Sequence, residues 1–172
     1  RLNQIGVSYE ALKELMSQPV EHPKERSFLP RNQFTGSVEF KDVTFTYPGQ
    51  QEPVLQNVSF KIEPGERVAI LGHVGSGKTT IGRLIAGLYE ADSGMVLVDG
   101  VDIRQIAPAD LRENLGISTQ DVWLMSTSIE ENISLGAVDA TAEQVVWAGD
   151  LAGVSEFANR HPDGYKLKLR ER

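Results

Sequence analysis

Residues 72–80 read GHVGSGKTT, with three glycines in quick succession and a lysine directly after the last of them. They satisfy the pattern G-x-x-x-x-G-K-[S/T]. Before them, residues 67–72 (RVAILG) form a short, nearly continuous apolar run, which is typical of a central strand covered on both faces. After them, residues 79–90 (TTIGRLIAGLYE) place apolar side chains on one face of a helix. The stretch therefore predicts the order strand, glycine loop, helix.

A loop of this kind suits a polyphosphate. Glycine lets the backbone turn tightly and bring successive N–H groups toward one point, and the following helix adds partial positive charge at its N-terminus. The Lys78 ammonium can reach the terminal phosphates, and the Thr79 hydroxyl can ligate magnesium. The residues that we expect to surround the phosphates are Gly72, His73, Val74, Gly75, Ser76, Gly77, Lys78, Thr79 and Thr80.

Two other interpretations of the loop are weaker. The first is an ordinary glycine-rich turn followed by a surface lysine, which would not require this spacing or these flanks. The second is a dinucleotide-binding fingerprint, G-x-G-x-x-G. Gly75 and Gly77 would supply its first two glycines, but Thr80 stands where the third should be. Lys78 would also crowd the close helix approach that this fingerprint serves.

Composition limits the function further. The 172 residues are 40% hydrophobic, enough for one domain with a sizeable core. The net charge of -7 opposes the phosphate attraction on which nucleic-acid binding depends, so no nucleic-acid partner is expected. The absence of cysteine excludes disulfides, thiolate metal sites and cysteine nucleophiles. No apolar run approaches the roughly 18 residues that span a bilayer, and the three histidines are scattered.

The pattern along the chain predicts an α/β fold. Residues 1–17 form an amphipathic helix that stops before a proline, residues 18–36 form a proline-containing linker, and residues 37–172 form the compact domain. We expect an antiparallel strand pair over 37–62, with a bulge in its first strand, and a second buried strand over 116–120. The remaining segments favour short strands around a turn at 99–100, then helices at 108–116, 129–136, 141–153 and 154–164.

Together these residues resemble the nucleotide-binding domain of ATP-binding-cassette (ABC) transporters. Residues 72–103 (GHVGSGKTTIGRLIAGLYEADSGMVLVDGVDI) carry much of the likeness. It extends upstream through 37–72 and downstream through 111–133, and it covers 37–172 as a whole. The resemblance implies a P-loop NTPase core with a mostly parallel sheet flanked by helices, plus a small antiparallel β subdomain. The chain would be the N-terminal part of this domain, truncated at its C-terminal side.

The resemblance also implies roles for two residues outside the loop. Tyr47 matches an aromatic residue that stacks on adenine, for which a tyrosine ring offers a large apolar face. Gln120 matches a glutamine that helps Thr79 to coordinate Mg²⁺ and communicates with the membrane partner. The alternatives are a strand-end tyrosine that packs on its own sheet and a glutamine in a surface turn. Where the family has a proline-containing continuation, Val122 and Trp123 stand instead.

The parent molecule implied is an ATPase that drives export at the cytoplasmic face of the bacterial inner membrane. Its partners would be ATP, Mg²⁺, the transmembrane domain of the same exporter, and a second nucleotide-binding domain in a head-to-tail dimer. Residues 1–23 look like the extension that joins the last transmembrane helix to the cassette in type I secretion and peptide exporters. Lipid or drug exporters of similar architecture are the alternative.

Hydrolysis needs residues that these 172 do not include. The family's L-S-G-G-Q signature, the strand ending in Asp-Glu and the switch histidine are not among them. We therefore expect no catalytic base in this chain, only assistance from Lys78 and Gln120, and binding of Mg-ATP with little turnover. A soluble P-loop kinase or GTPase would share Lys78 but has no need of Tyr47 or Gln120. A regulatory cassette that does not hydrolyse ATP would retain all three.

Overall fold

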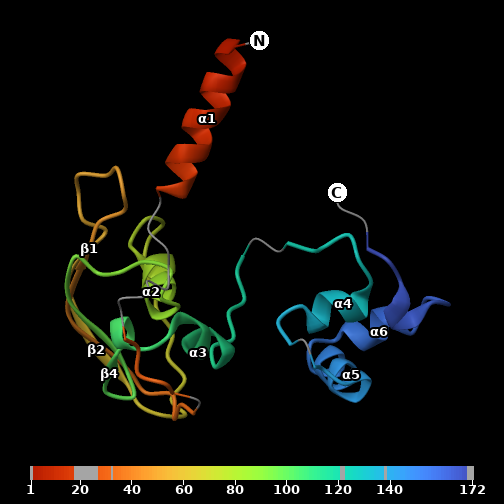
Figure 1. Ribbon diagram of the computed structural model, residues 1–172. Coiled ribbons are helices and arrows are strands. Elements are labelled where there is room, and N and C mark those ends of the chain that lie inside the picture. Colours follow the sequence, from red (N-terminus) through yellow and green to blue (C-terminus); the bar gives the residue numbers. More distant parts are fainter. Residues whose placement is uncertain (1, 18–26, 32, 121–122, 138, 170–172) are drawn as a thin grey trace. The chain divides into compact units, whose positions relative to one another are not determined.

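The chain contains two compact units, Arg1–Gly116 and Ile117–Arg172. A computed structural model shows the path of each unit (Figure 1). The residues that it describes are 2–17, 27–31, 33–120, 123–137 and 139–169.

The first helix, α1, spans Leu2–Met16. Four of its large side chains lie exposed, namely those of Tyr9, Leu12, Leu15 and Met16. The expected linker covers residues 18–36, and its first part, residues 18–26, lies outside the described residues. Within the described parts of the chain, no helix combines the length and apolar character needed to cross a bilayer.

The first unit is built on a four-stranded sheet in the order β2-β1-β3-β4, with all neighbouring strands antiparallel. The strands are β1 (Val38–Phe45), β2 (Leu55–Ile62), β3 (Ser93–Val98) and β4 (Val101–Asp102). The predicted bulge in β1 is confirmed, because its register with β3 shifts between Lys41 and Thr44. Asp42 adopts a φ of 49° there, and a Cβ on Gly94 would lie 2.4 Å from two β1 carbonyl oxygens.

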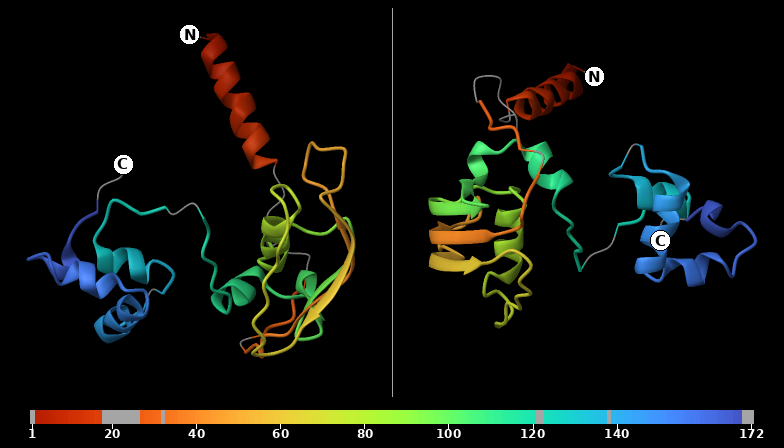
Figure 2. Two further views of the ribbon diagram at one scale, coloured as in Figure 1. Left: turned by 180° about the vertical axis from the view of Figure 1, so that it is seen from behind. Right: turned by 90° about the horizontal axis from the view of Figure 1, so that it is seen from below.

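The core lies between this sheet and the helix that follows the glycine loop. That helix, α2 (Lys78–Ile85), runs along one face of the sheet (Figure 2). Its Leu84 side chain is fully buried with Phe40 and Val43 of β1 in one hydrophobic cluster. The helix ends earlier than the apolar pattern predicts, because Gly87 turns the chain with a φ of 63°. α2 is thereby held rigidly with its N-terminus at the glycine loop.

Two expected strands are not formed in this structure, and the described residues show no parallel sheet. Neither residues 67–72 nor residues 116–120 form a strand, and the only sheet among the described residues is the antiparallel one. Leu71 is 92% exposed, and Ile117 is also exposed. A central parallel strand needs hydrogen-bonded neighbours on both sides, and no described strand pairs with either segment. Apolar composition alone says nothing about which strands are available as neighbours.

Shorter elements complete the first unit. A 3₁₀ turn, η1 (Ile103–Gln105), precedes α3 (Pro108–Glu113), which begins on a proline as the sequence predicts. The segment ahead of β1 is bonded to this region, since Leu29 forms a parallel bridge with Ile106 and its N–H donates to the Gln105 carbonyl at 2.7 Å. Part of the proline-containing segment is therefore fixed to the unit.

The second unit is helical. It contains α4 (Ile129–Ser134), α5 (Ala142–Leu151), α6 (Val154–Ala158) and the 3₁₀ turn η2 (Gly164–Lys166). Capping boxes begin α4 and α5, with Ser128 and Thr141 as the N-cap residues. The predicted N-cap at Thr141 is confirmed. The three predicted helices in this region are present, although each is shorter than the range expected from the sequence (129–136, 141–153 and 154–164).

Candidate functional site

The glycine loop has the backbone shape that a phosphate cradle requires. Gly75 and Gly77 both adopt left-handed φ angles, 84° and 86°. A Cβ on Gly77 would lie 2.6 Å from Leu55 Cδ2 and 3.2 Å from the Val54 carbonyl oxygen, so a side chain does not fit there. Gly77 is also the N-cap of α2 and offers no side chain to cap the helix. The N–H groups of the first helical turn are thereby left for an anionic ligand.

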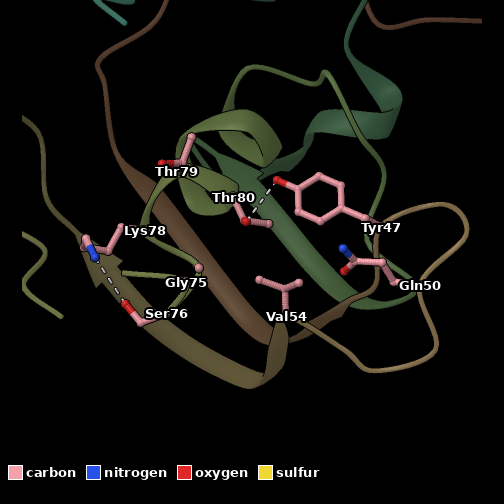
Figure 3. Close-up of a pocket in the computed structure, with 9 residues that line it drawn as sticks. Tyr47, Gln50, Val54, Gly75, Ser76, Lys78, Thr79 and Thr80 are labelled. Carbon is pink, nitrogen blue, oxygen red and sulfur yellow. Dashed lines mark hydrogen bonds between the residues drawn. The ribbon is translucent and has the colours of Figure 1, made fainter. Parts of the chain in front are cut away.

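Lys78 lies folded back over this loop. Its Nζ donates to the carbonyl oxygens of Gly72 at 2.8 Å and His73 at 2.6 Å. It also donates to Ser76 Oγ at 3.4 Å, the bond that Figure 3 shows. The cation is therefore held by the same short segment whose N–H groups would meet a phosphate. It can exchange neutral carbonyl partners for phosphate oxygens, which form stronger charge-assisted hydrogen bonds.

An open pocket of about 370 Å³ joins the loop to the end of the sheet. Residues 75–80 line one side of it, and Tyr47, Gln50 and Val54 line the other (Figure 3). The structure thus brings Tyr47 into one pocket with Lys78, as the sequence predicts. Gln50 was missed by sequence reasoning because the turn at 48–53 carries only a turn signal, and Val54 was missed because it begins the expected second strand. Both residues lie well before the glycine loop in the chain, so the sequence does not show that they share a pocket with it.

Tyr47 is held at both its ring and its hydroxyl. The ring is nearly perpendicular to those of Phe45 and Tyr89, with centroids 4.9 Å and 5.2 Å away. The hydroxyl lies 3.0 Å from Thr80 Oγ1 and accepts a hydrogen bond from Arg83 Nη1 at 3.1 Å. Tyr47 therefore packs on its own sheet and lines the pocket at the same time, so the two interpretations of this residue are compatible.

Four expected site residues do not line this pocket. Val74 is fully exposed, while Gly72 and His73 contribute backbone carbonyls to Lys78. Gln120 is an exposed residue of the second unit, so its pairing with Thr79 at a magnesium ion stays a prediction. Within the described ranges, no group of three or more histidine, cysteine or acidic residues could hold a metal ion. A single protein ligand such as the Thr79 hydroxyl would be sufficient for a magnesium ion whose other ligands are mainly phosphate oxygens and water.

The fold and the loop define an α/β protein with a glycine loop of the P-loop type. Residues 55–169 match the family model of the ABC transporter, and the chain belongs to that family. It is 41% identical over 168 residues to a fatty acid ABC transporter ATP-binding/permease protein of Mycobacterium bovis, covering 96% of this chain and 26% of that protein. It is 39% identical over 168 residues to the cyclolysin secretion/processing ATP-binding protein CyaB of Bordetella pertussis, covering 98% and 23%.

A solved structure shows the same fold. A bacterial Atm1-family ABC exporter with ATP bound aligns with a TM-score of 0.84 at 32% identity, over 99% of this chain and 30% of that one. The chain thus spans between about a quarter and a third of the length of these relatives.

Proposed function

We propose that the chain binds Mg-ATP in the pocket between Tyr47 and residues 75–80, as the ATP-binding part of an ABC exporter. The observation that carries this proposal is the shared pocket: an aromatic ring and a phosphate loop face the same open space. A base can stack on the ring while a triphosphate lies along the loop. Membership of the ABC transporter family and the likeness to an ATP-bound exporter support it.

The backbone N–H groups of the loop, the Lys78 ammonium and the magnesium ligands each have a distinct role in the proposed complex. The N–H groups of the loop and of the first turn of α2 donate to phosphate oxygens. Lys78 leaves the Gly72 and His73 carbonyls and neutralises the terminal phosphates. Magnesium, when bound, would be held by Thr79, with Gln120 as the proposed second protein ligand, and it would neutralise negative charge on the phosphates.

In the parent exporter, we propose that ATP binding and hydrolysis are coupled to transport across a membrane. The cassette would lie at the cytoplasmic face of the bacterial inner membrane, with a transmembrane domain and a second cassette, head to tail, as partners. Support comes from the relatives described as ATP-binding/permease proteins. Because the 172 residues hold no L-S-G-G-Q segment, we expect them to turn over ATP negligibly by themselves.

For the cargo, we propose a protein or peptide exported by type I secretion. The likeness of residues 1–23 to the extension in such exporters and the similarity to CyaB support this choice. Lipid or drug export is the competing candidate, and relatives described as a fatty acid transporter, a multidrug exporter and a lipid A-core flippase favour it.

The Lys78→Ala variant tests the proposed ATP site. Calorimetric titration with Mg-ATP should show affinity lower by about tenfold or more, since a hydrogen bond to a charged group contributes about 1.5–3 kcal/mol. Lys61→Ala is the matched control, because Lys61 is an exposed lysine on β2 that pairs with Glu63. Unchanged affinity in Lys78→Ala would contradict the proposal.

A further inference from the structure

We propose that Arg83 is a positioning residue that holds the Tyr47 ring in place for the nucleotide base. This inference rests on the proposed function. It deepens that function because it names a residue that sets selectivity for a nucleotide over a bare triphosphate. The juxtaposition that carries it is a three-residue arrangement at the Tyr47 hydroxyl, with Thr80 and Arg83 both contributed by α2.

The direction of the hydrogen bonds follows from chemistry. A guanidinium group can only donate, so the Tyr47 oxygen must accept from Arg83 Nη1 at 3.1 Å. The phenolic hydrogen is then available to Thr80 Oγ1, which lies 3.0 Å away. Thr80 is only 3% exposed, so its hydroxyl is a fixed partner. The Tyr47 hydroxyl is thus bonded on two sides.

Tyr47 needs this support because of where it lies in the chain. It comes two residues after β1 ends at Phe45, and it belongs to no strand. Its ring packs against Phe45 and Tyr89, which limits its tilt, and the hydroxyl contacts with Thr80 and Arg83 tie it to α2. The guanidinium carbon of Arg83 lies 5.8 Å from the ring centroid, close enough for a cation–π contribution.

α2 therefore connects the two ends of the proposed nucleotide site. Its N-terminus carries Lys78 and Thr79, which face the phosphates, and its later turn carries Arg83, which fixes Tyr47. The spacing between the base platform and the phosphate loop is set within one rigid helix. A nucleotide of matching length benefits from this spacing, whereas a bare triphosphate does not use the platform.

The Arg83→Met variant tests the inference, because it keeps the aliphatic stem and removes the donors. By calorimetry, we expect the affinity for Mg-ATP to fall about three- to tenfold and the affinity for magnesium tripolyphosphate to stay unchanged. Arg83→Lys, which keeps a charged donor, should restore part of the loss. Arg160→Met is the control, since Arg160 is exposed and pairs with Glu156 on α6.

A second background separates positioning from direct contact. In Tyr47→Phe the ring stays but its hydroxyl is gone, so adding Arg83→Met should cause a smaller further loss of ATP affinity than in the wild-type background, limited to the cation–π contribution. Equal losses for ATP and tripolyphosphate, or a full additional loss in the Tyr47→Phe background, would overturn the inference. A wild-type chain that binds neither ligand would instead refute the proposed function.

A measurement without nucleotide tests the positioning role even if the wild-type chain binds neither ligand. With tyrosine labelled at the ring carbons with ¹³C, the NMR signal of Tyr47 should shift in Arg83→Met and stay in place in Arg160→Met. A Tyr47 signal that is the same in wild type and Arg83→Met would mean that Arg83 does not hold the ring.

Discussion

The Asp99 carboxylate accepts two hydrogen bonds from Thr35, one from its backbone N–H and one from its hydroxyl, each 2.7 Å long. Gly36 and Ser37 donate their N–H groups to the same carboxylate at 3.0 and 2.9 Å, and Arg31 pairs with it at 3.2 Å. The Asp99 side chain is only 5% exposed. The turn between β3 and β4 therefore fixes the segment that leads into β1.

This cluster predicts a pH-dependent stability. Burial raises the pKa of Asp99, but the hydrogen bonds from Thr35, Ser37 and Gly36 together lower it to about 2, from an ordinary value of 3.8. Because the folded pKa lies below the unfolded one, the stabilisation is present above about pH 4 and is lost as the pH falls toward 2. The N–H groups of residues 35–37 should exchange faster with solvent deuterium over the same interval.

Asp99→Asn tests the charge at this position while tolerating the left-handed φ of 50°. At pH 7 we expect the free energy of unfolding to fall by about 1–3 kcal/mol, because three backbone N–H groups lose an anionic acceptor. The difference from wild type should shrink as the pH falls toward 2. Asp139→Asn, at an exposed position, is the control. Equal effects of the two substitutions in thermal denaturation would contradict this role.

Gly77→Ala should damage the loop itself. The new Cβ would approach Leu55 and the Val54 carbonyl within a backbone conformation that favours glycine. We expect a loss of about 1–3 kcal/mol in stability and strongly weakened ATP binding by calorimetry. Gly82→Ala is a matched control in α2, because nothing lies within 4 Å of its added Cβ, and it should stabilise the helix by about 0.5–1 kcal/mol. If Gly77→Ala bound ATP normally, the loop would not need its present shape.

Tyr47→Ala separates base from phosphate recognition. Removing the ring should weaken Mg-ATP by roughly five- to a hundredfold, since stacking on an aromatic side chain contributes about 1–3 kcal/mol. Magnesium tripolyphosphate should bind as to wild type. Tyr9→Ala, on the exposed surface of α1, serves as the control. Equal losses for both ligands in isothermal calorimetry would argue against stacking.

Gly149→Ala probes the packing of the second unit. A Cβ there would lie 2.1 Å from Tyr165 Oη and would displace that ring, breaking its 2.5 Å hydrogen bond with Ser155. We expect the unit to lose about 1–3 kcal/mol of stability in a denaturant titration followed by tryptophan fluorescence, because Trp147 lies on the same helix. Gly136→Ala, with open space around its added Cβ, should change little. A similar midpoint for both variants would show that Tyr165 can move freely.

Local features were the ones that the sequence predicted well. The bulge in β1, the N-cap at Thr141 and the helix after the glycine loop all depend on residues close together in the chain. The strands expected at 67–72 and 116–120 are not formed, because a central strand depends on neighbouring strands that its own residues do not specify. The same reason explains why Gln50 and Val54 were missed as lining residues.

The sequence by itself determined the glycine loop, since glycine spacing, backbone freedom and the start of a helix are all contained within nine residues. Only the tertiary structure decided which side chains support it. Arg83 and Tyr47 are 36 residues apart, and Asp99 and Thr35 are 64 apart. Such pairs form because the packing of α2 and the sheet brings distant segments together, and no local pattern of residues encodes that packing.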